Sequence, residues 1–263
     1  MKSLVMAVIV AIAAASLSAA DPSSPALDKK EQGRINREKF VKATGGFIID
    51  KRNAVGHASI INSQKRLKVS FLKAKAEALE KNVWFFVKYS EPSKPIALDG
   101  IEDAVKEAGG KASVILLEAE RLPTLMVLPE SRCAIVNVTE LAKGCKDDAA
   151  LEERASKEIT RAFCFAFGAG YSSRAGGAMD PITSLEELDK ILVDVIGLDV
   201  LPAVSRSAEQ FGIGRFKRTT YLKACQEGWA AAPTNDVQKA IWEQTRQIPT
   251  KPIKIEFDPA KGK

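Results

Sequence analysis

The sequence lacks the residues that the common hydrolase and metal centres require. It has one histidine, His57, among 263 residues, whereas a histidine-based zinc centre needs two or three imidazoles. No G-x-S-x-G motif, P-loop or EF-hand loop is present. His57 stands in a turn before an expected strand, where a structural role is commoner than a catalytic one. Ser–Lys dyads stay open in a lysine-rich chain, but nothing in the sequence singles one out.

Aromatic residues are also scarce, at 6% of the chain, although 46% of the residues are hydrophobic. A domain of this composition is expected to bury a mostly aliphatic core. Basic residues are not interleaved with aromatic ones as they are in a nucleic-acid groove. The sequence therefore carries no specific nucleic-acid signal.

The net charge of +6 is unevenly distributed. Residues 21–100 hold 16 Lys and Arg against nine Asp and Glu, and the rest of the chain after them is slightly acidic. A basic first third favours an anionic surface or polymer as partner. A solvated amphipathic helix followed by a lysine-rich linker would explain the same surplus. A protein partner is open as well, and no cofactor is indicated.

Long apolar runs are absent except at the start. Lys2 precedes an apolar run from Leu4 to Ala15, and Ser18-Ala19-Ala20 has the small residues of a cleavage site. This pattern predicts a signal peptide over residues 1–20 and export of bacterial type, to the periplasm or outside the cell. A membrane anchor is the alternative, but the run is short for a span. No later stretch predicts a transmembrane segment.

Four cysteines lie in the second half of the chain, and export would allow them to form disulfides. Four cysteines permit three pairings, and the sequence does not select one. None has the close paired spacing of zinc ligands. Cys164, within an apolar run, could equally be a small buried residue. The four are Cys133, Cys145, Cys164 and Cys225.

Composition and turn signals divide the chain after the signal peptide into four parts. Residues 21–43 are expected to form a flexible leader, up to about Ile35, and then a short helix. Residues 44–198 should form an α/β domain, and residues 199–247 a C-terminal helical part. Residues 248–263, rich in proline and lysine, are expected to be an extended tail.

The α/β domain is expected to contain a mixed, mostly parallel sheet packed on a long buried helix. A strand–helix–strand order predicts a parallel pair with a right-handed crossover, and Pro129–Arg132 predicts the turn of an antiparallel edge hairpin. The helix that follows is apolar nearly all round at its end, which is typical of a buried helix. The expected strands are 47–49, 57–62, 83–89, 112–117, 124–128 and 133–138; the expected helices are 35–43, 65–81, 98–108, 149–167, 185–195, 219–227 and 235–247.

The most distinctive stretch runs from Arg161 to Pro181. The end of an apolar helix breaks at Gly168 and Gly170, passes a loop of small residues and closes on Met179-Asp180-Pro181. This order resembles the metzincin clan of zinc peptidases, archaemetzincins included, whose pattern H-E-x-x-H-x-x-G-x-x-H is followed by a Met-turn. The preceding order of strands and helices also looks like the first half of a zincin domain. The resemblance implies a zincin-like fold.

The metal-binding positions of that pattern are not matched. The three ligand histidines would fall on Arg161, Phe165 and Tyr171, and the general-base glutamate on Ala162. Arginine and phenylalanine cannot ligate a metal, alanine cannot accept a proton, and tyrosine is a weak ligand here. The resemblance therefore implies a degenerate domain without zinc and without peptidase activity.

Arg161, Tyr171 and Asp180 would line the vacated cleft of such a domain. An ion pair between Arg161 and Asp180 would fill the old metal site; alternatively, Arg161 would bind a carboxylate or another anion. The expected function is an exported non-catalytic protein with a binding or structural role. The alternatives are a hydrolase with an unrecognised active site and a module that binds anionic surfaces through its basic first third.

Overall fold

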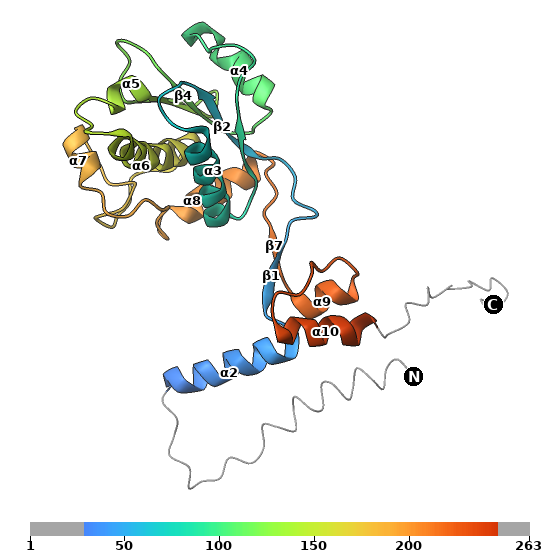
Figure 1. Cartoon of the computed structure of the whole chain (residues 1–263). Helices are drawn as coiled ribbons and strands as arrows, with labels where there is room; N and C mark the ends of the chain where they lie inside the picture. Colours follow the sequence, from blue (N-terminus) through green and yellow to red (C-terminus); the bar gives the residue numbers. More distant parts are fainter. Residues whose placement is uncertain (1–28, 247–263) are drawn as a thin grey trace, which may run out of the picture. The chain divides into compact units, whose positions relative to one another are not determined.

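The computed structural model describes residues 29–246, which form two compact units (Figure 1). The sheet unit spans Ile49–Arg218, and the helical unit combines the chain up to Ile48 with the chain from Thr219. The chain crosses between them in β1 (Phe47–Asp50) and β7 (Lys217–Thr220), and these two strands pair with each other. The expected signal peptide and extended tail lie outside the described residues.

The sheet unit is built on five strands in the order β3-β2-β4-β6-β5. The first four are parallel, and β5 pairs antiparallel with β6 at the edge. Every residue of β4 and β6 is buried, as continuous apolar runs in a parallel sheet covered on both faces should be. The mixed, mostly parallel sheet with an edge hairpin is therefore confirmed. Its strands are β2 (Ala58–Ser63), β3 (Val87–Ser90), β4 (Ser113–Leu117), β5 (Leu125–Leu128) and β6 (Cys133–Asn137).

Helices cover both faces of this sheet (Figure 1). On one face, α3 (Val69–Val83) and α6 (Asp148–Ala166) pack on alternate strand residues such as Ile60, Val114 and Val136. On the other face, α4 (Ile101–Ala108), which continues a short turn over Leu98–Gly100, packs on Ile61, Ile115 and Ile135. This alternation follows from the two-residue period of a strand. The remaining helices of the unit are α5 (Val138–Leu141), α7 (Leu185–Asp189) and α8 (Leu201–Gln210).

The long central helix α6 forms as its sequence predicts. Asp147 caps it, because the side-chain carboxylate accepts a hydrogen bond of 2.8 Å from the amide of Ala150. The helix ends before Gly168, whose φ of 70° lies in the left-handed region that ends helices. Twelve of its residues are buried, four of them charged: Arg154, Lys157, Glu158 and Arg161. The interior of this unit therefore has to satisfy several charges.

Two expected elements are shorter in the structure. The strand expected over 83–89 begins only at Val87, because α3 runs on to Val83 and Trp84, with φ of 61°, turns the chain. Buried Val83 and Phe85 meet the core from a helix end and a turn, which an apolar run by itself does not distinguish from a strand. The helix expected over 185–195 stops at Asp189.

The helix α8 lies between residues 195 and 219, where no regular element is expected from the sequence. Pro202 lies in the first turn of α8, where a proline needs no hydrogen-bond partner for its nitrogen. The same helix belongs to the sheet unit, so that unit reaches Arg218 instead of ending at residue 198. The C-terminal helical part accordingly begins at Thr219.

The helical unit joins both ends of the described chain. Its helices are α2 (Lys29–Thr44), α9 (Tyr221–Gln226) and α10 (Asp236–Arg246). Residues 29–34, expected to be flexible, form the first turns of α2. Gly45 follows with φ of 72°, and a Cβ there would lie 2.8 Å from Cβ of Tyr221, so glycine is needed for α9 to pack against the turn. The Gln238 amide on α10 donates to the Gly45 carbonyl at 3.2 Å.

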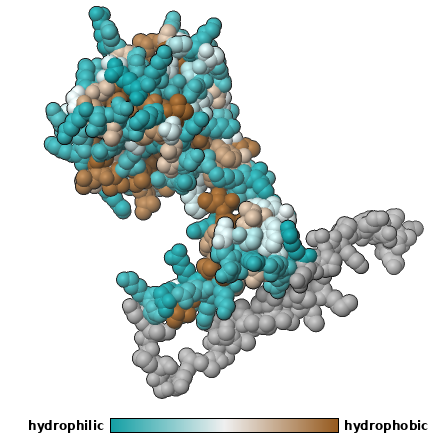
Figure 2. All heavy atoms as spheres, in the orientation of Figure 1, coloured by the Kyte–Doolittle hydropathy of each residue, from teal (hydrophilic) through white to brown (hydrophobic). Residues whose placement is uncertain are grey.

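The surface carries apolar side chains at several places, mainly among hydrophilic ones (Figure 2). The most exposed large ones are Leu192 and Leu198, at 88% and 75% of their full accessibility. Both lie in the segment between α7 and α8. Within the described ranges, no helix has the length and apolar character that a membrane span requires.

Candidate functional site

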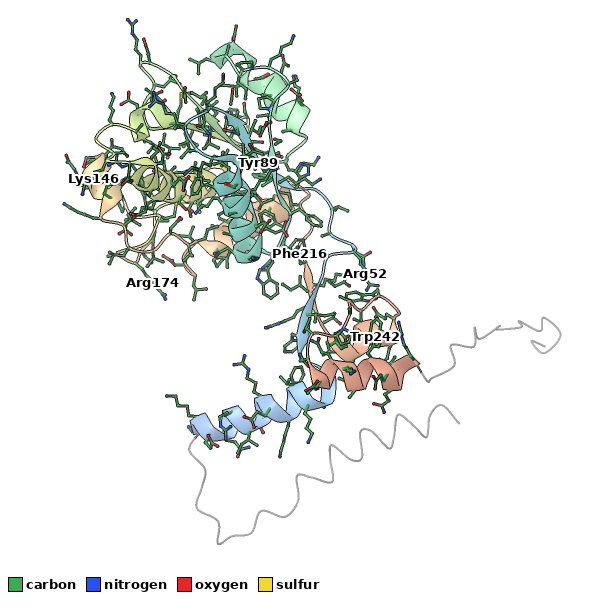
Figure 3. All side chains as sticks on the ribbon, viewed as in Figure 1. Arg52, Tyr89, Lys146, Arg174, Phe216 and Trp242 are labelled. Carbon is green, nitrogen blue, oxygen red and sulfur yellow. The ribbon has the colours of Figure 1, made fainter. Side chains whose placement is uncertain are left out.

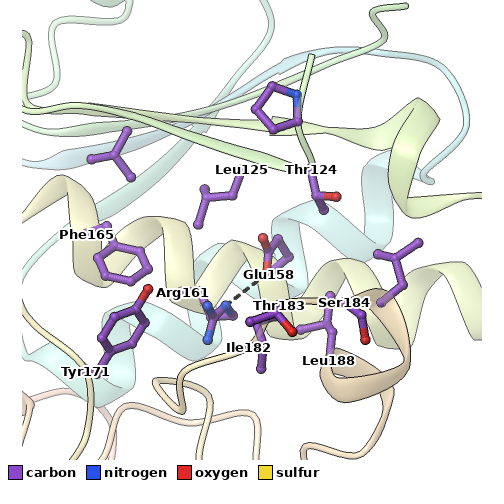
Figure 4. A pocket seen from close by; sticks show the side chains of 13 residues that line it. Thr124, Leu125, Glu158, Arg161, Phe165, Tyr171, Ile182, Thr183, Ser184 and Leu188 are labelled. Atoms are coloured by element: carbon purple, nitrogen blue, oxygen red, sulfur yellow. Dashed lines mark ion pairs between the residues drawn. The ribbon is translucent and has the colours of Figure 1, made fainter. Parts of the chain in front are cut away.

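A pocket of about 420 Å³ opens between the edge strand β5, the helix α6 and the segment that leads into α7 (Figure 4). Thr124 and Leu125 form one side, and Phe165 and Tyr171 form an end. Leu188 contributes an apolar wall from α7. The pocket brings together three segments that are far apart in sequence.

The sequence-predicted site residues are only partly gathered here. Arg161, Phe165 and Tyr171 all line the pocket. Ala162 does not, because it is fully buried in the core on another side of α6. Met179 is likewise part of the core and is 1% exposed.

Asp180 and Pro181 lie outside this pocket, in a neighbouring cavity of about 250 Å³. The carboxylate of Asp180 accepts a hydrogen bond of 2.6 Å from the amide of Gly176. The expected ion pair between Arg161 and Asp180 is therefore wrong: Arg161 contacts the backbone carbonyl of Asp180 instead of its side chain. The hydrogen bond from Gly176 holds the Asp180 carboxylate away from Arg161.

Arg161 connects α6 to the turn that carries Met179. Its Nη1 donates to the carbonyls of Ala178 and Asp180, at 2.9 and 2.6 Å. Its Nε lies 3.0 Å from Oε2 of Glu158, one helical turn earlier, and the two side chains are 4% and 3% exposed. Nη1 is therefore hydrogen-bonded within the protein, whereas Nε and Glu158 Oε2 form a buried ion pair without hydrogen-bond geometry, in which Glu158 supplies the counter-charge (Figure 4).

Glu158 is a charged pocket residue that the sequence pattern does not predict. It lies three residues before Arg161, where the metzincin-like pattern begins, so the pattern does not include it. Its position three residues before Arg161 is a signal for a contact between the two side chains, because residues with this spacing are neighbours on a helix surface. Burial raises the pKa of the Glu158 carboxyl above its usual value, although Arg161 acts in the opposite direction.

Three cations form a stripe along α6 and bind the segment 178–189. Arg154 contacts both carboxylate oxygens of Asp189, at 2.8 and 2.6 Å, and Lys157 donates to the Asp189 carbonyl at 3.0 Å. Arg161 is the third cation of the stripe, and it donates hydrogen bonds to the carbonyls of Ala178 and Asp180 in the same segment. The spacing of three and four residues places all three on one side of the helix.

The rim of the pocket carries aromatic and hydroxyl groups. The rings of Phe165 and Tyr171 meet edge to face at 5.5 Å, and Tyr171 is 57% exposed. Thr183 and Ser184 lie at the start of α7, where the Ser184 hydroxyl accepts from the Glu187 amide at 3.2 Å and Thr183 donates to the Glu187 carboxylate at 3.0 Å. Ser184 thus caps α7, and Glu187 holds Thr183 in front of the helix.

The donor set of the pocket does not fit a zinc ion. Arg161 and Phe165 offer no lone pair to a metal, and Glu158 already faces Arg161. Across residues 29–246, no three His, Cys, Asp or Glu side chains are grouped as metal ligands. His57 lies elsewhere, with its Nε2 3.1 Å from the Ala108 carbonyl, and burial lowers its pKa.

The four cysteines are all free in the structure. Cys133 and Cys164 are buried, and burial raises the pKa of each thiol to about 12. Cys164 is thus the small core residue that the sequence allowed, while Cys145 and Cys225 are partly exposed.

A second polar cluster lies on α6 away from the pocket. The Asp194 carboxylate accepts from Lys75 at 2.6 Å, from Thr160 at 2.6 Å and from the Ser156 hydroxyl. Burial lowers the pKa of Lys75, against the attraction of Asp194. A few residues on, the exposed Asp199 binds Ser172 and Ser173. Both carboxylates thus bind side chains of other segments and fix the segment that exposes Leu192 and Leu198.

Comparison with known proteins gives two similar solved structures. No family model matches the chain, and no curated protein matches it. The archaemetzincin of Methanopyrus kandleri is 18% identical, with a TM-score of 0.46 over 60% of this chain and 98% of its own. A zinc-dependent peptidase from Methanocorpusculum labreanum is 16% identical, with a TM-score of 0.45 over 57% of this chain and 100% of its own.

Proposed function

We propose that the sheet unit is a non-catalytic, metzincin-like binding domain whose pocket takes an extended polypeptide segment. The observation that carries this proposal is the buried contact set of Arg161. Where a metallopeptidase would bind its ion, this chain has an arginine bound to Glu158 and to two backbone carbonyls. These contacts tie α6 to the following turn without a metal. We therefore treat the zinc site as replaced by a structural cross-link.

The pocket suits a neutral and partly apolar ligand. The charges of Glu158 and Arg161 balance each other, so Arg161 is not left to attract an anion. Leu125, Phe165 and Leu188 supply apolar walls. An anion-binding role for Arg161 is thereby disfavoured.

The edge of the sheet adds a reason to expect a polypeptide. Among the described strands, β5 has one neighbour, β6, and four of the residues that line the pocket belong to or precede β5: Pro123, Thr124, Leu125 and Val127. A free strand edge can pair with an extended segment, while pockets beside it receive alternate side chains. Tyr171, aromatic and more than half exposed at the rim, is the residue best placed as an anchor.

Binding to a displayed library of unstructured peptides, with affinities measured by calorimetry, tests this proposal. We expect selected peptides to lose about tenfold in affinity with Tyr171→Ala, since an interface anchor typically contributes more than 1 kcal/mol. Leu192→Ala, an exposed apolar residue outside the pocket, is the matched control and should leave affinity unchanged. Equal losses in both variants would refute the site.

Metal analysis and a broad peptide and ester hydrolysis screen test the non-catalytic part. We expect purified protein to contain no stoichiometric zinc and to hydrolyse nothing above background. Stoichiometric zinc with turnover that a chelator abolishes would overturn the proposal.

A hydrolase is the second candidate, because Glu158 is a buried carboxyl with a raised pKa beside a pocket. A carboxyl whose pKa is raised by burial is a candidate general acid or base. If the screen finds turnover without metal, Glu158→Gln should abolish it, whereas turnover that survives this substitution would exclude Glu158 as its acid or base.

Binding to anionic surfaces is a third candidate function, and the helical unit would carry it. α2 carries six Lys and Arg against two Glu, and none of its residues is buried. Affinity for an anionic polymer should then fall steeply with salt. Binding that is absent, or insensitive to salt, would remove this candidate.

Export is the remaining part of the proposal and rests on residues 1–20, outside the described residues. Expression in a bacterium with N-terminal sequencing of the periplasmic protein tests it. A mature start near Asp21 is expected, and an uncleaved cytoplasmic product would contradict it.

A further inference from the structure

A second cavity, larger than the first, opens at the carboxyl ends of three adjacent parallel strands. It has a volume of about 670 Å³ and is lined by residues that end or follow β2, β3 and β4, among them Ser63, Glu91 and Glu118. The chain leaves β2 into α3 on one face of the sheet and leaves β3 into α4 on the other. In open α/β sheets, ligands bind in the crevice where connections diverge in this way.

Hydrogen bonds tie the three loops around this cavity to one another. The Ser63 hydroxyl accepts from the Ile96 amide at 2.8 Å, which links the loop after β2 to the loop after β3. The Lys65 amide donates to the Glu118 carboxylate at 3.3 Å, which links the first loop to the segment after β4. A cavity whose walls are already joined loses little order when a ligand binds.

A chain of hydrogen-bonded polar groups, which runs from buried Asn62 to exposed Glu91, supports the same wall. Asn62 is 8% exposed; its side-chain amide donates to the hydroxyl of Tyr89 (Figure 3), which donates in turn to Glu91 at 2.6 Å. Burial and the neighbouring Glu91 raise the pKa of Tyr89 to about 12, so the phenol remains a donor at neutral pH. The Asn62 side-chain oxygen also accepts from Gln64 at 2.7 Å.

The floor of the cavity is apolar and the size is that of a small-molecule site. Leu67 and Leu117 are each 3% exposed and come from the two opposite faces of the sheet, and half-buried Ile96 lies beside them. Ligand pockets of about 300–1,000 Å³ with apolar walls and a few polar groups are typical of small-molecule binding.

The mouth of the cavity carries charged groups of both signs. Both carboxylates already accept hydrogen bonds from the protein: Glu91 from Tyr89, and Glu118 from the Lys65 amide with Arg66 3.5 Å away. Within the described part of the chain, the ammonium groups of Lys65 and Lys94 have no carboxylate within ion-pair distance. The positive charge available to a ligand therefore comes from these two lysines.

The shape of the loops distinguishes between kinds of anion. Phosphate-binding loops use glycines so that backbone amides can approach the phosphate closely. The lining segments 62–69 and 91–96 contain no glycine. Two flexible lysines over an apolar floor suit a carboxylate with a short hydrocarbon portion better than they suit a phosphate.

We propose that this cavity is a second ligand site, which binds a small organic carboxylate between Lys65 and Lys94 with its apolar part against Leu67 and Leu117. The site is independent of the polypeptide pocket, which lies beside β5 at the other edge of the sheet.

Titration of ¹⁵N-labelled full-length protein with hexanoate, followed by amide chemical shifts, tests the proposal. We expect saturable shifts at residues 63–65, 93–96 and 118, and smaller or no shifts around Tyr171. Each of Lys65→Gln and Lys94→Gln should weaken binding about two- to fivefold, and both together about tenfold, as exposed ion pairs of this kind allow.

Three comparisons make the result decisive. Lys106→Gln removes an exposed lysine on α4 that does not line the cavity, and it should leave the affinity unchanged. Hexanol at the same concentration should bind more weakly than hexanoate, and inorganic phosphate more weakly still. Equal binding of hexanol, tighter binding of phosphate, or shifts confined to other parts of the molecule would each overturn the proposal.

Discussion

Two groups of buried charges lie along α6, and they hold the chain in different ways. Glu158 and Arg161 are three residues apart on one helix, and both are almost completely buried. Lys75 and Asp194 lie 119 residues apart, and Asp194 also accepts hydrogen bonds from Ser156 and Thr160. The first pair borders a pocket, whereas the second anchors a surface segment.

The difference shows which contacts a helix can provide by itself. Glu158 and Arg161 become neighbours as soon as α6 forms, so their mutual neutralisation needs no tertiary structure. Lys75 reaches Asp194 only after α3, α6 and the segment beyond α7 have packed together. A local pair therefore determines the chemistry of the pocket, while a long-range pair determines where a loop lies.

The largest effect is expected from Asp194→Ala. This substitution leaves the ammonium of Lys75 buried without its counter-ion, and we expect a loss of about 3 kcal/mol in the free energy of unfolding. Asp103→Ala, which removes an exposed carboxylate beside Lys106, should cost less than about 0.5 kcal/mol. Urea denaturation monitored by circular dichroism measures both. Similar losses in the two variants would show that the Lys75–Asp194 contact is not an anchor.

A smaller effect is expected from Glu158→Ala. Arg161 loses its counter-charge but keeps two backbone carbonyls, so we expect a loss of about 2 kcal/mol. The double variant Glu158→Leu with Arg161→Met should lose less stability than the sum of the losses in the single variants Glu158→Leu and Arg161→Met, because neither charge is left without its partner.

Glu77→Ala, an exposed glutamate on α3, is the control for that experiment and should change little. Additive losses in the double variant would contradict a coupled pair.

The smallest effect is a change in pH dependence. The pKa of Glu158 is raised above 4.5 by burial, so the folded protein holds this proton more tightly than the unfolded chain does. The contribution of this group to stability is therefore fully present below pH 4.5 and is lost as the pH rises through the folded pKa. The wild type should lose stability relative to Glu158→Gln over that window.

Paired urea titrations of both proteins between about pH 4 and 7 measure this difference. A wild type that gains stability relative to the variant as the pH rises would show that the attraction of Arg161 outweighs burial.

Much of the sheet unit could be predicted because its signals are local. Asp147 and Ser184 cap their helices as the spacing of polar residues indicates, and Gly168 ends α6. The apolar runs of β4 and β6 lie in the sheet interior. These features depend on neighbours within a few residues, which the sequence contains directly.

The candidate site was predictable only in part. Arg161, Phe165 and Tyr171 reach one pocket because helix spacing and the turn after it bring them there. Asp180 was misplaced, because the amide of Gly176 competes for its carboxylate, and Glu158 was missed, because it lies outside the pattern. Which of several possible polar partners a side chain binds depends on the final packing.

The sequence by itself determined the order of the five sheet strands, the long buried helix, the hairpin at the sheet edge, and the arginine, phenylalanine and tyrosine at positions 161, 165 and 171. Only the tertiary structure decided that Arg161 binds backbone carbonyls, that Asp194 and Asp199 bind side chains distant in sequence, and that the ends of β2, β3 and β4 surround a cavity. The reason is physical. Propensities and caps act over one helical turn, whereas the burial of a charge requires partners that folding brings together from distant parts of the chain.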